Sequence, residues 1–169
     1  MAAMTATADT QTLWGQIQRS RHGYPCGRNE LPRLLFGHFQ ELMQAGELRA
    51  ALEDTWSLCE WPGRAADTTS WLALWGLAGA DHTPVTGPIW RAAAEVYADG
   101  LSWTTDRNIA VRFHDRNLKR FPTMPGRCGL WRIDHPESSH VLAVLDDASH
   151  RNEHEIVYSP QVDELVREL

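Results

Sequence analysis

The chain has 169 residues, of which 43% are hydrophobic and 22% charged, a balance that fits one domain or a small domain with a helical appendage and excludes wholesale disorder. Sixteen Lys and Arg against 22 Asp and Glu give a formal net charge of −6. This charge argues against non-specific attraction of the whole chain to nucleic acid or to an anionic membrane, and it leaves room for a small local basic site.

The cysteines and the hydropathy bear on compartment. Cys26, Cys59 and Cys128 are odd in number and widely spaced, and they form no CxxC pair, which disfavours a disulfide framework and a cysteine zinc site. No apolar run approaches the roughly 18 residues of a membrane span. The first residues lack the basic start and apolar core of a signal peptide. We expect a soluble, cytoplasmic protein with no membrane partner and no metal.

The first half of the chain is predicted to be helical after a flexible start. Residues 1–29 are expected to be flexible, because 1–12 are rich in Ala and Thr and 20–29 contain two glycines and a proline. Residues 30–82 form the predicted helical part, since apolar residues recur there at three- and four-residue steps. The helices are expected over 30–46, from 48 to just before 61, and from about 67, with a cap among Asp67, Thr68 and Thr69, to 79.

The second half, residues 83–169, is predicted to consist mostly of strands. Short β-branched or aromatic runs bounded by Gly, Pro, Asp or Ser indicate strands at 88–93, 100–104, 129–134, 139–145 and 154–160. A helix is expected over 106–119, capped by Asp106, with Ile109, Ala110 and Phe113 on its inner face. Helices followed by strands predict an α+β fold in which helices pack against part of a small sheet.

A pair of carboxylates, Glu153 and Glu155, opens the last of these strands. Alternation places them on one face about 7 Å apart, where one could stabilise a developing cation while the other accepts a hydrogen bond or a proton. Taken alone, such a pair is more often a solvated strand edge. His150 and His154 also complete an H-x-x-E-H zinc-peptidase pattern, but that motif needs a helix, which the β-branched residues that follow disfavour.

Two further segments carry polar groups among apolar residues. Ser102 and Thr104 share one face of their strand, opposite Leu101 and Trp103, and hydroxyls can orient a carboxylate. Arg91 lies in an otherwise apolar strand, where a guanidinium either extends to solvent or binds an anion such as phosphate.

In combination, the arginine, the S-x-T and the E-x-E occur in the order of a known family. The stretch IWRAAAEVYADGLSWTTDRNIAVRF, followed by VLAVL and RNEHEIVYSP, resembles bacterial and phage members of the R-S-E class of NAD-dependent mono-ADP-ribosyltransferases. The resemblance covers about residues 84–160. It implies a split-sheet catalytic core over 83–169.

The resemblance also implies roles for individual residues. Arg91 would hold the phosphate and ribose of NAD, Ser102 would position the catalytic Glu155, Thr104 would buttress the strand, and Glu153 would engage the acceptor. A glycine often follows the arginine in that family, and here Ala92 stands in its place. The loop 146–152 would face the acceptor, and Phe113, Phe121 or Trp131 would stack on nicotinamide. The predicted catalytic residues are Glu155, Glu153 and Ser102, and the predicted cofactor-binding residues are Arg91, Ala92, Ser102, Trp103, Thr104 and Phe113.

The expected activity is transfer of ADP-ribose from NAD, as co-substrate, to a macromolecular acceptor, with protein arginine favoured. One alternative is modification of a nucleic-acid base, and the other is a non-catalytic module that binds NAD or a partner. A run of five basic residues between positions 112 and 127 is interpreted first as a solvated helix face and otherwise as a contact to a phosphate-bearing acceptor. The resemblance is compatible with a toxin, phage or bacterial conflict role and with an antitoxin or immunity partner. The basic run consists of Arg112, Arg116, Lys119, Arg120 and Arg127.

Overall fold

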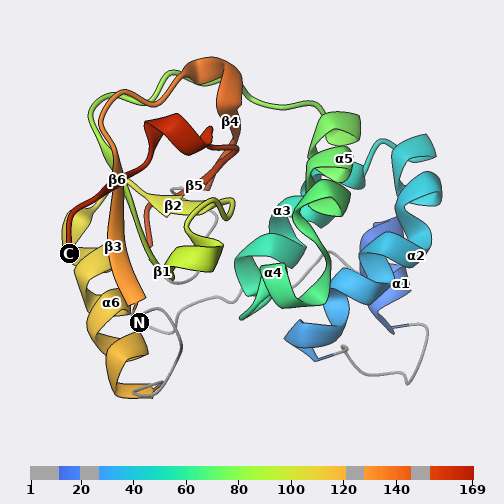
Figure 1. Ribbon diagram of the computed structural model, residues 1–169. Coiled ribbons are helices and arrows are strands. Elements are labelled where there is room, and N and C mark those ends of the chain that lie inside the picture. The colour runs from blue at the N-terminus through green and yellow to red at the C-terminus, as the bar shows by residue number, and fades with distance from the viewer. Residues whose placement is uncertain (1–11, 20–26, 121–127, 146–152) are drawn as a thin grey trace, which may run out of the picture. The chain divides into compact units, whose positions relative to one another are not determined.

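The chain divides into two compact units, with the boundary between Gly79 and Ala80, close to the boundary expected at residue 82. The computed structural model describes residues 12–19, 27–120, 128–145 and 153–169 (Figure 1). No helix in these residues is long and apolar enough to cross a membrane.

The N-terminal unit is helical, and the three predicted long helices are confirmed. Asp67 caps the last of them, since its side chain accepts a hydrogen bond of 2.8 Å from the Ser70 amide. Trp71 and Trp75 are buried and pack edge-to-face against Trp56. The helices are α1 (Leu13–Arg19), α2 (Leu31–Gln44), α3 (Leu48–Leu58), α4 (Pro62–Ala65) and α5 (Thr68–Ala78), with a 3-10 turn η1 (Arg28–Glu30) before α2.

Helix α1 lies inside the segment 1–29 that was expected to be flexible, so that expectation is wrong for Leu13–Arg19. The physical reason is burial of Trp14 and Ile17 together with a polar anchor. The Glu47 carboxylate accepts hydrogen bonds from the amides of Leu13 and Trp14, at 3.0 and 2.9 Å, and so satisfies donors in the first turn. The remainder of 1–29, apart from Thr12 and residues 27–29, lies outside the described residues.

The C-terminal unit is built on one six-stranded antiparallel sheet, and with the helical unit it confirms the predicted α+β class (Figure 1). The strand order is β4-β5-β2-β1-β3-β6. The five predicted strands are present, and the short edge strand β6 was not predicted. The strands are β1 (Ile89–Ala94), β2 (Ser102–Thr104), β3 (Cys128–Ile133), β4 (Val141–Val144), β5 (Glu155–Tyr158) and β6 (Val166–Arg167), with 3-10 turns η2 (Glu95–Tyr97), η3 (Ser138–His140) and η4 (Val162–Glu164).

The junction between β1 and β2 is narrow. The two strands share one register pair, Trp90 opposite Thr104, whereas β1 pairs with β3 along its whole length. The resemblance implies a split sheet. The structure has one continuous sheet, whose two parts are joined at this junction by the single register pair of Trp90 and Thr104. Helix α6 (Arg107–Arg120) packs against β1 and β3 and buries Ile109 and Ala110. Phe113, which was predicted to lie on the inner face of this helix, is only half-buried.

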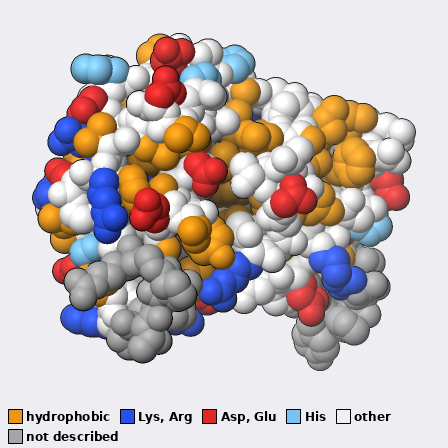
Figure 2. Space-filling model, in the orientation of Figure 1, with side chains coloured by type: hydrophobic (Ala, Val, Ile, Leu, Met, Phe, Trp, Pro, Cys, Tyr) orange, Lys and Arg blue, Asp and Glu red, His pale blue; other side chains and the backbone are white. Residues whose placement is uncertain are grey.

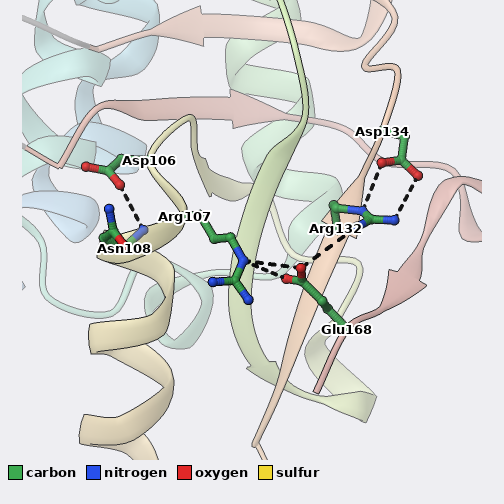
Figure 3. Close-up of polar contacts among 6 residues, drawn as sticks. All are labelled: Asp106, Arg107, Asn108, Arg132, Asp134 and Glu168. Atoms are coloured by element: carbon green, nitrogen blue, oxygen red, sulfur yellow. Dashed lines mark hydrogen bonds and ion pairs between the residues drawn. The ribbon is translucent and has the colours of Figure 1, made fainter.

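A charged cluster ties the C-terminal end of the chain to the sheet and to α6 (Figure 3). Glu168 lies 3.2 Å from Arg107 at the start of α6 and 3.8 Å from Arg132 on β3. Arg132 also contacts Asp134, at 2.9 Å. These contacts are partly exposed, so each contributes about 1 kcal/mol or less, and together they hold the two-residue strand β6 against β3.

Candidate active site

The three residues predicted to form the centre of the site, Arg91, Ser102 and Glu155, lie together in the C-terminal unit. They come from three strands, β1, β2 and β5, that are neighbours in the sheet. The register explains why two of them meet. Thr104 lies directly opposite Glu155 and Ser102 opposite Val157, so Ser102, Thr104 and Glu155 share one face of the sheet.

Ser102 and Glu155 are in direct contact. The Ser102 hydroxyl donates a hydrogen bond of 2.5 Å to Glu155 Oε1. Glu155 is 8% exposed, and the half-buried Ser102 covers it from the next strand. A buried carboxylate held by a neighbouring hydroxyl has a fixed position and little reorganisation to undergo, as electrostatic stabilisation of a nearby cation requires.

Arg91 reaches the same site from β1. It alternates with Trp90, which pairs with Thr104, and so leaves the strand on the other face of the sheet. Because β1 and β2 do not pair beyond Trp90 and Thr104, the guanidinium can still reach the backbone of β2. Its Nη1 donates a hydrogen bond of 2.6 Å to the Ser102 carbonyl, and its Nε donates one of 3.2 Å to the Tyr97 carbonyl.

Burial leaves Arg91 with a charge that its hydrogen-bond partners do not neutralise. Desolvation lowers the pKa of the guanidinium from its ordinary value to about 10, although the negative charges of Glu155 and Asp99 favour the protonated form. Among the residues that the structure describes, none forms an ion pair with Arg91. The group remains a cation at pH 7, and its Nη2 donors are not used by the described chain.

Gly100 is a part of the site that the sequence interpretation missed. A Cβ placed on this residue would lie 2.2 Å from Nη2 of Arg91 and 2.6 Å from its Cζ. Only a glycine lets the backbone approach the guanidinium this closely. The signal available in the sequence was the glycine two residues before Ser102, which was included only as the first residue of the predicted strand 100–104.

Glu153 lies before the start of β5 and is not placed by strand alternation. Strand β5 begins at Glu155, and His154 has a φ of 46°, which breaks the extended backbone. The prediction that Glu153 and Glu155 share one face of a strand is therefore wrong. The Thr104 hydroxyl donates 2.7 Å to the Glu153 carbonyl and accepts 3.1 Å from the Asp106 amide, and the Thr105 amide donates 3.2 Å to the His154 carbonyl.

Two of the predicted cofactor-binding side chains lie elsewhere. Trp103 is 2% exposed, donates from its indole to the Gly100 carbonyl and packs on Tyr158, so its side chain belongs to the core. Phe113 is half-buried on α6 with the Arg116 guanidinium 4.5 Å from its ring centre. Ala92 is half-buried in β1 opposite Leu130, on the same face as Trp90.

The other predicted features are exposed, buried or outside the described residues. Trp131, a candidate for stacking on nicotinamide, is 8% exposed, and the Arg167 guanidinium lies 5.7 Å from its ring centre. In the basic run, Arg112, Arg116, Lys119 and Arg120 are exposed on α6. The described residues contain no group of three or more metal-ligating side chains. The loop 146–152 with His150, Phe121, Arg127 and Cys26 lies outside the described residues.

A surface groove of about 450 Å³ lies in the same unit but away from these residues. None of the predicted site residues lines it, so chemistry and not cavity size identifies the candidate site. Compared with protein-family models, with curated proteins and with solved structures, the chain has no match in any of the three. The groove is lined by Val85, Gly87, Pro88, Asp134, His135 and Pro136.

Proposed function

We propose that the chain is an NAD-dependent mono-ADP-ribosyltransferase that transfers ADP-ribose to a protein arginine with release of nicotinamide. The observation that carries the proposal is the linkage of three residues from three strands: Arg91 to the Ser102 carbonyl at 2.6 Å, and the Ser102 hydroxyl to Glu155 at 2.5 Å. A cation, a hydroxyl and a carboxylate are thereby held within one small region, as the resemblance to the R-S-E class requires.

Arg91 fits a role in holding the pyrophosphate of NAD. Its guanidinium is buried enough for the pKa to fall to about 10, yet it pairs with two carbonyls and with no carboxylate among the described residues. A half-buried, partly desolvated cation without a counter-ion is costly, and a bound phosphate would offset that cost. The planar guanidinium matches the geometry of phosphate oxygens.

Glu155 would stabilise the charge that develops as NAD is cleaved. The glycosidic bond between the ribose carbon and the nicotinamide nitrogen breaks, and its electron pair leaves with nicotinamide, so positive charge builds on the ribose. A fixed carboxylate beside that carbon lowers the barrier, because the charge it stabilises is larger in the transition state than in the ground state. The Ser102 hydroxyl keeps Glu155 oriented toward the ribose.

Glu153 would act on the acceptor. A guanidine nitrogen forms the new bond to the ribose carbon and loses a proton, and because the pKa of arginine is above about 12, the neutral nucleophile is scarce at pH 7. A carboxylate that orients the guanidinium and accepts its proton as the bond forms removes this obstacle. The hydrogen bond from the Thr104 hydroxyl to the Glu153 carbonyl fixes the backbone from which the Glu153 carboxylate extends.

The proposal is tested by incubating the protein with NAD labelled in its adenylate part and a cell extract, beside Glu155→Gln and a matched control, Glu137→Gln. Glu137 is an exposed glutamate of the same unit. We expect labelled protein with the parent and the control, and loss of labelling by at least about 100-fold with Glu155→Gln. Equal labelling by all three would remove Glu155 from the mechanism.

The same assay separates the two alternatives. Label on RNA or DNA and not on protein would favour a nucleic-acid base as acceptor. Saturable NAD binding without nicotinamide release would favour a non-catalytic module. Within this proposal the chain acts in the cytoplasm, where the thiols of Cys59 and Cys128 would stay reduced.

A further inference from the structure

The connection between β1 and β2, residues 95–101, exposes an unusual combination of side chains beside the candidate site. Val96 is 72% exposed and Tyr97 is 59% exposed, and Glu95 and Asp99 are exposed around them. Among the Trp, Tyr and Phe residues that the structure describes, Tyr97 is the only one in the exposed class. Folding does not account for two adjacent exposed hydrophobic side chains, since neither buries its apolar surface.

This connection is nevertheless firmly anchored. Ala98 and Leu101 are buried beneath it, at 4% and 5% exposure. The Tyr97 carbonyl accepts a hydrogen bond from the Gly100 amide and another from Arg91 Nε, both of 3.2 Å. The exposed ring of Tyr97 is therefore carried on a backbone that is bonded directly to the guanidinium of the site.

The charge of the connection is negative. No Lys or Arg occurs between Arg91 and Arg107, whereas Glu95 and Asp99 flank the exposed pair. Glu95 is 69% exposed and lies 3.8 Å from Arg167, a distance at which an exposed ion pair contributes little. Hydrophobic and acidic side chains lie side by side on the face drawn in Figure 2, so exposure next to carboxylates does not by itself mark a site. The hydrogen bond to Arg91 is what distinguishes this connection.

From these observations, and resting on the proposed function, we infer that residues 95–99 bind an arginine-bearing segment of the protein acceptor. Tyr97 offers a ring face to a guanidinium, which stacks on aromatic rings by a cation–π contact. Glu95 and Asp99 supply complementary charge, and Val96 supplies apolar contact for the stem of a long side chain. The connection would thus hold an arginine beside the candidate site, to which the Tyr97 carbonyl is bonded through Arg91.

The test compares Tyr97→Ala with Tyr97→Phe, which keeps the ring, and with Val162→Ala, an exposed apolar control 79% exposed in the same unit. Two rates are measured: transfer to an arginine-containing peptide, and nicotinamide release without acceptor. We expect Tyr97→Ala to raise the KM for the peptide roughly 3- to 10-fold, Tyr97→Phe to restore it, and nicotinamide release to stay unchanged in all variants.

A second pair of changes tests the charge. Glu95→Gln with Asp99→Asn should raise the peptide KM further and weaken its dependence on salt. An unchanged peptide KM in Tyr97→Ala, or an equal fall in nicotinamide release, would overturn the inference while leaving the proposed function standing. Absence of nicotinamide release from the parent protein itself would instead overturn the proposed function, and the inference with it.

Discussion

The hydroxyl of Ser102 and the carboxylate of Glu155 are 53 residues apart in the chain and 2.5 Å apart in the fold. They meet because β2 and β5 are antiparallel neighbours whose register sets Ser102 diagonally from Glu155 on one face. The contact fixes one oxygen of a carboxylate that is almost fully buried. Its role in the proposed activity can be separated from its role in folding by single substitutions.

Replacing Ser102 by alanine should lower kcat for nicotinamide release roughly 10- to 100-fold. A hydrogen bond to a charged group contributes about 1.5–3 kcal/mol, and the substitution removes the one that the Ser102 hydroxyl donates to Glu155 Oε1. The KM for NAD should change little, because Arg91 bonds to the Ser102 carbonyl and not to its side chain. Steady-state kinetics check the expectation, with Ser138→Ala, an exposed serine of the same unit, as control.

Replacing Gly100 by alanine should raise the KM for NAD about 10-fold or more and destabilise the fold by about 1–3 kcal/mol. The new methyl group would fall 2.2 Å from Nη2 of Arg91, so the guanidinium must move away from its carbonyl partners. Chemical denaturation and NAD titration measure the two effects.

Gly76→Ala provides a control whose expected effect on folding stability is opposite to that of Gly100→Ala. Gly76 lies exposed in α5, and a Cβ there would meet nothing within 4 Å. Gly76→Ala should therefore stabilise the helical unit by about 1 kcal/mol through helix propensity and leave the KM for NAD unchanged. If Gly100→Ala behaved like Gly76→Ala in both measurements, the close approach to Arg91 would have no role.

The pH dependence of kcat/KM for NAD should report Arg91. This quantity follows the free enzyme, in which burial lowers the pKa of the guanidinium to about 10, so we expect it to fall as pH rises through about 10. In the Arg91→Lys variant, kcat/KM for NAD should fall at a lower pH, because a lysine has an ordinary pKa of about 10.4 and burial lowers it. A profile that stayed flat to pH 11 would separate Arg91 from NAD binding.

Deprotonation of Arg91 at alkaline pH should affect folding stability and NAD binding in opposite directions. The pKa of Arg91 is lower in the folded state than in the unfolded one, so above about pH 10 the unfolded chain holds the proton more tightly than the folded chain does. The cost of burying this charge is fully present below pH 10 and is relieved above it. Stability and NAD affinity should therefore respond to alkaline pH in opposite directions as far as this residue is concerned.

Much of the fold could be predicted from local patterns. The apolar spacing of Leu31, Leu34 and Leu35 indicated α2, and Asp67 indicated the start of α5 through a side chain that does cap the helix. Strands β1, β3, β4 and β5 were also found, since each is a short apolar run bounded by breaking residues. Strand β6 was missed because two exposed residues carry no periodicity, and Glu168 holds them through contacts distant in sequence.

The candidate site was harder to predict in detail for the same reason. Residue types and their order brought Arg91, Ser102 and Glu155 forward, but their contacts depend on register, which a one-residue slip would change. Alternation failed for Glu153 because the positive φ of His154 ends the strand pattern, and nothing in a histidine announces that conformation. Gly100 was overlooked because its importance comes from the Arg91 side chain above it.

The hydroxyl of Thr104 should control transfer to the acceptor more than cleavage of NAD. It donates to the Glu153 carbonyl and accepts from the Asp106 amide, so it joins the end of β2 to the residue that would meet the acceptor. Thr104→Val keeps the shape and removes the hydroxyl, whereas Thr104→Ser keeps the hydroxyl. We expect the ratio of transfer to NAD hydrolysis to fall about 10-fold in Thr104→Val and to be retained in Thr104→Ser, because a displaced Glu153 lets water compete with arginine. His154→Gly, which tolerates the positive φ, should keep the ratio, and His154→Val should lower it. Equal losses of transfer and hydrolysis in Thr104→Val would instead assign Thr104 to the fold alone.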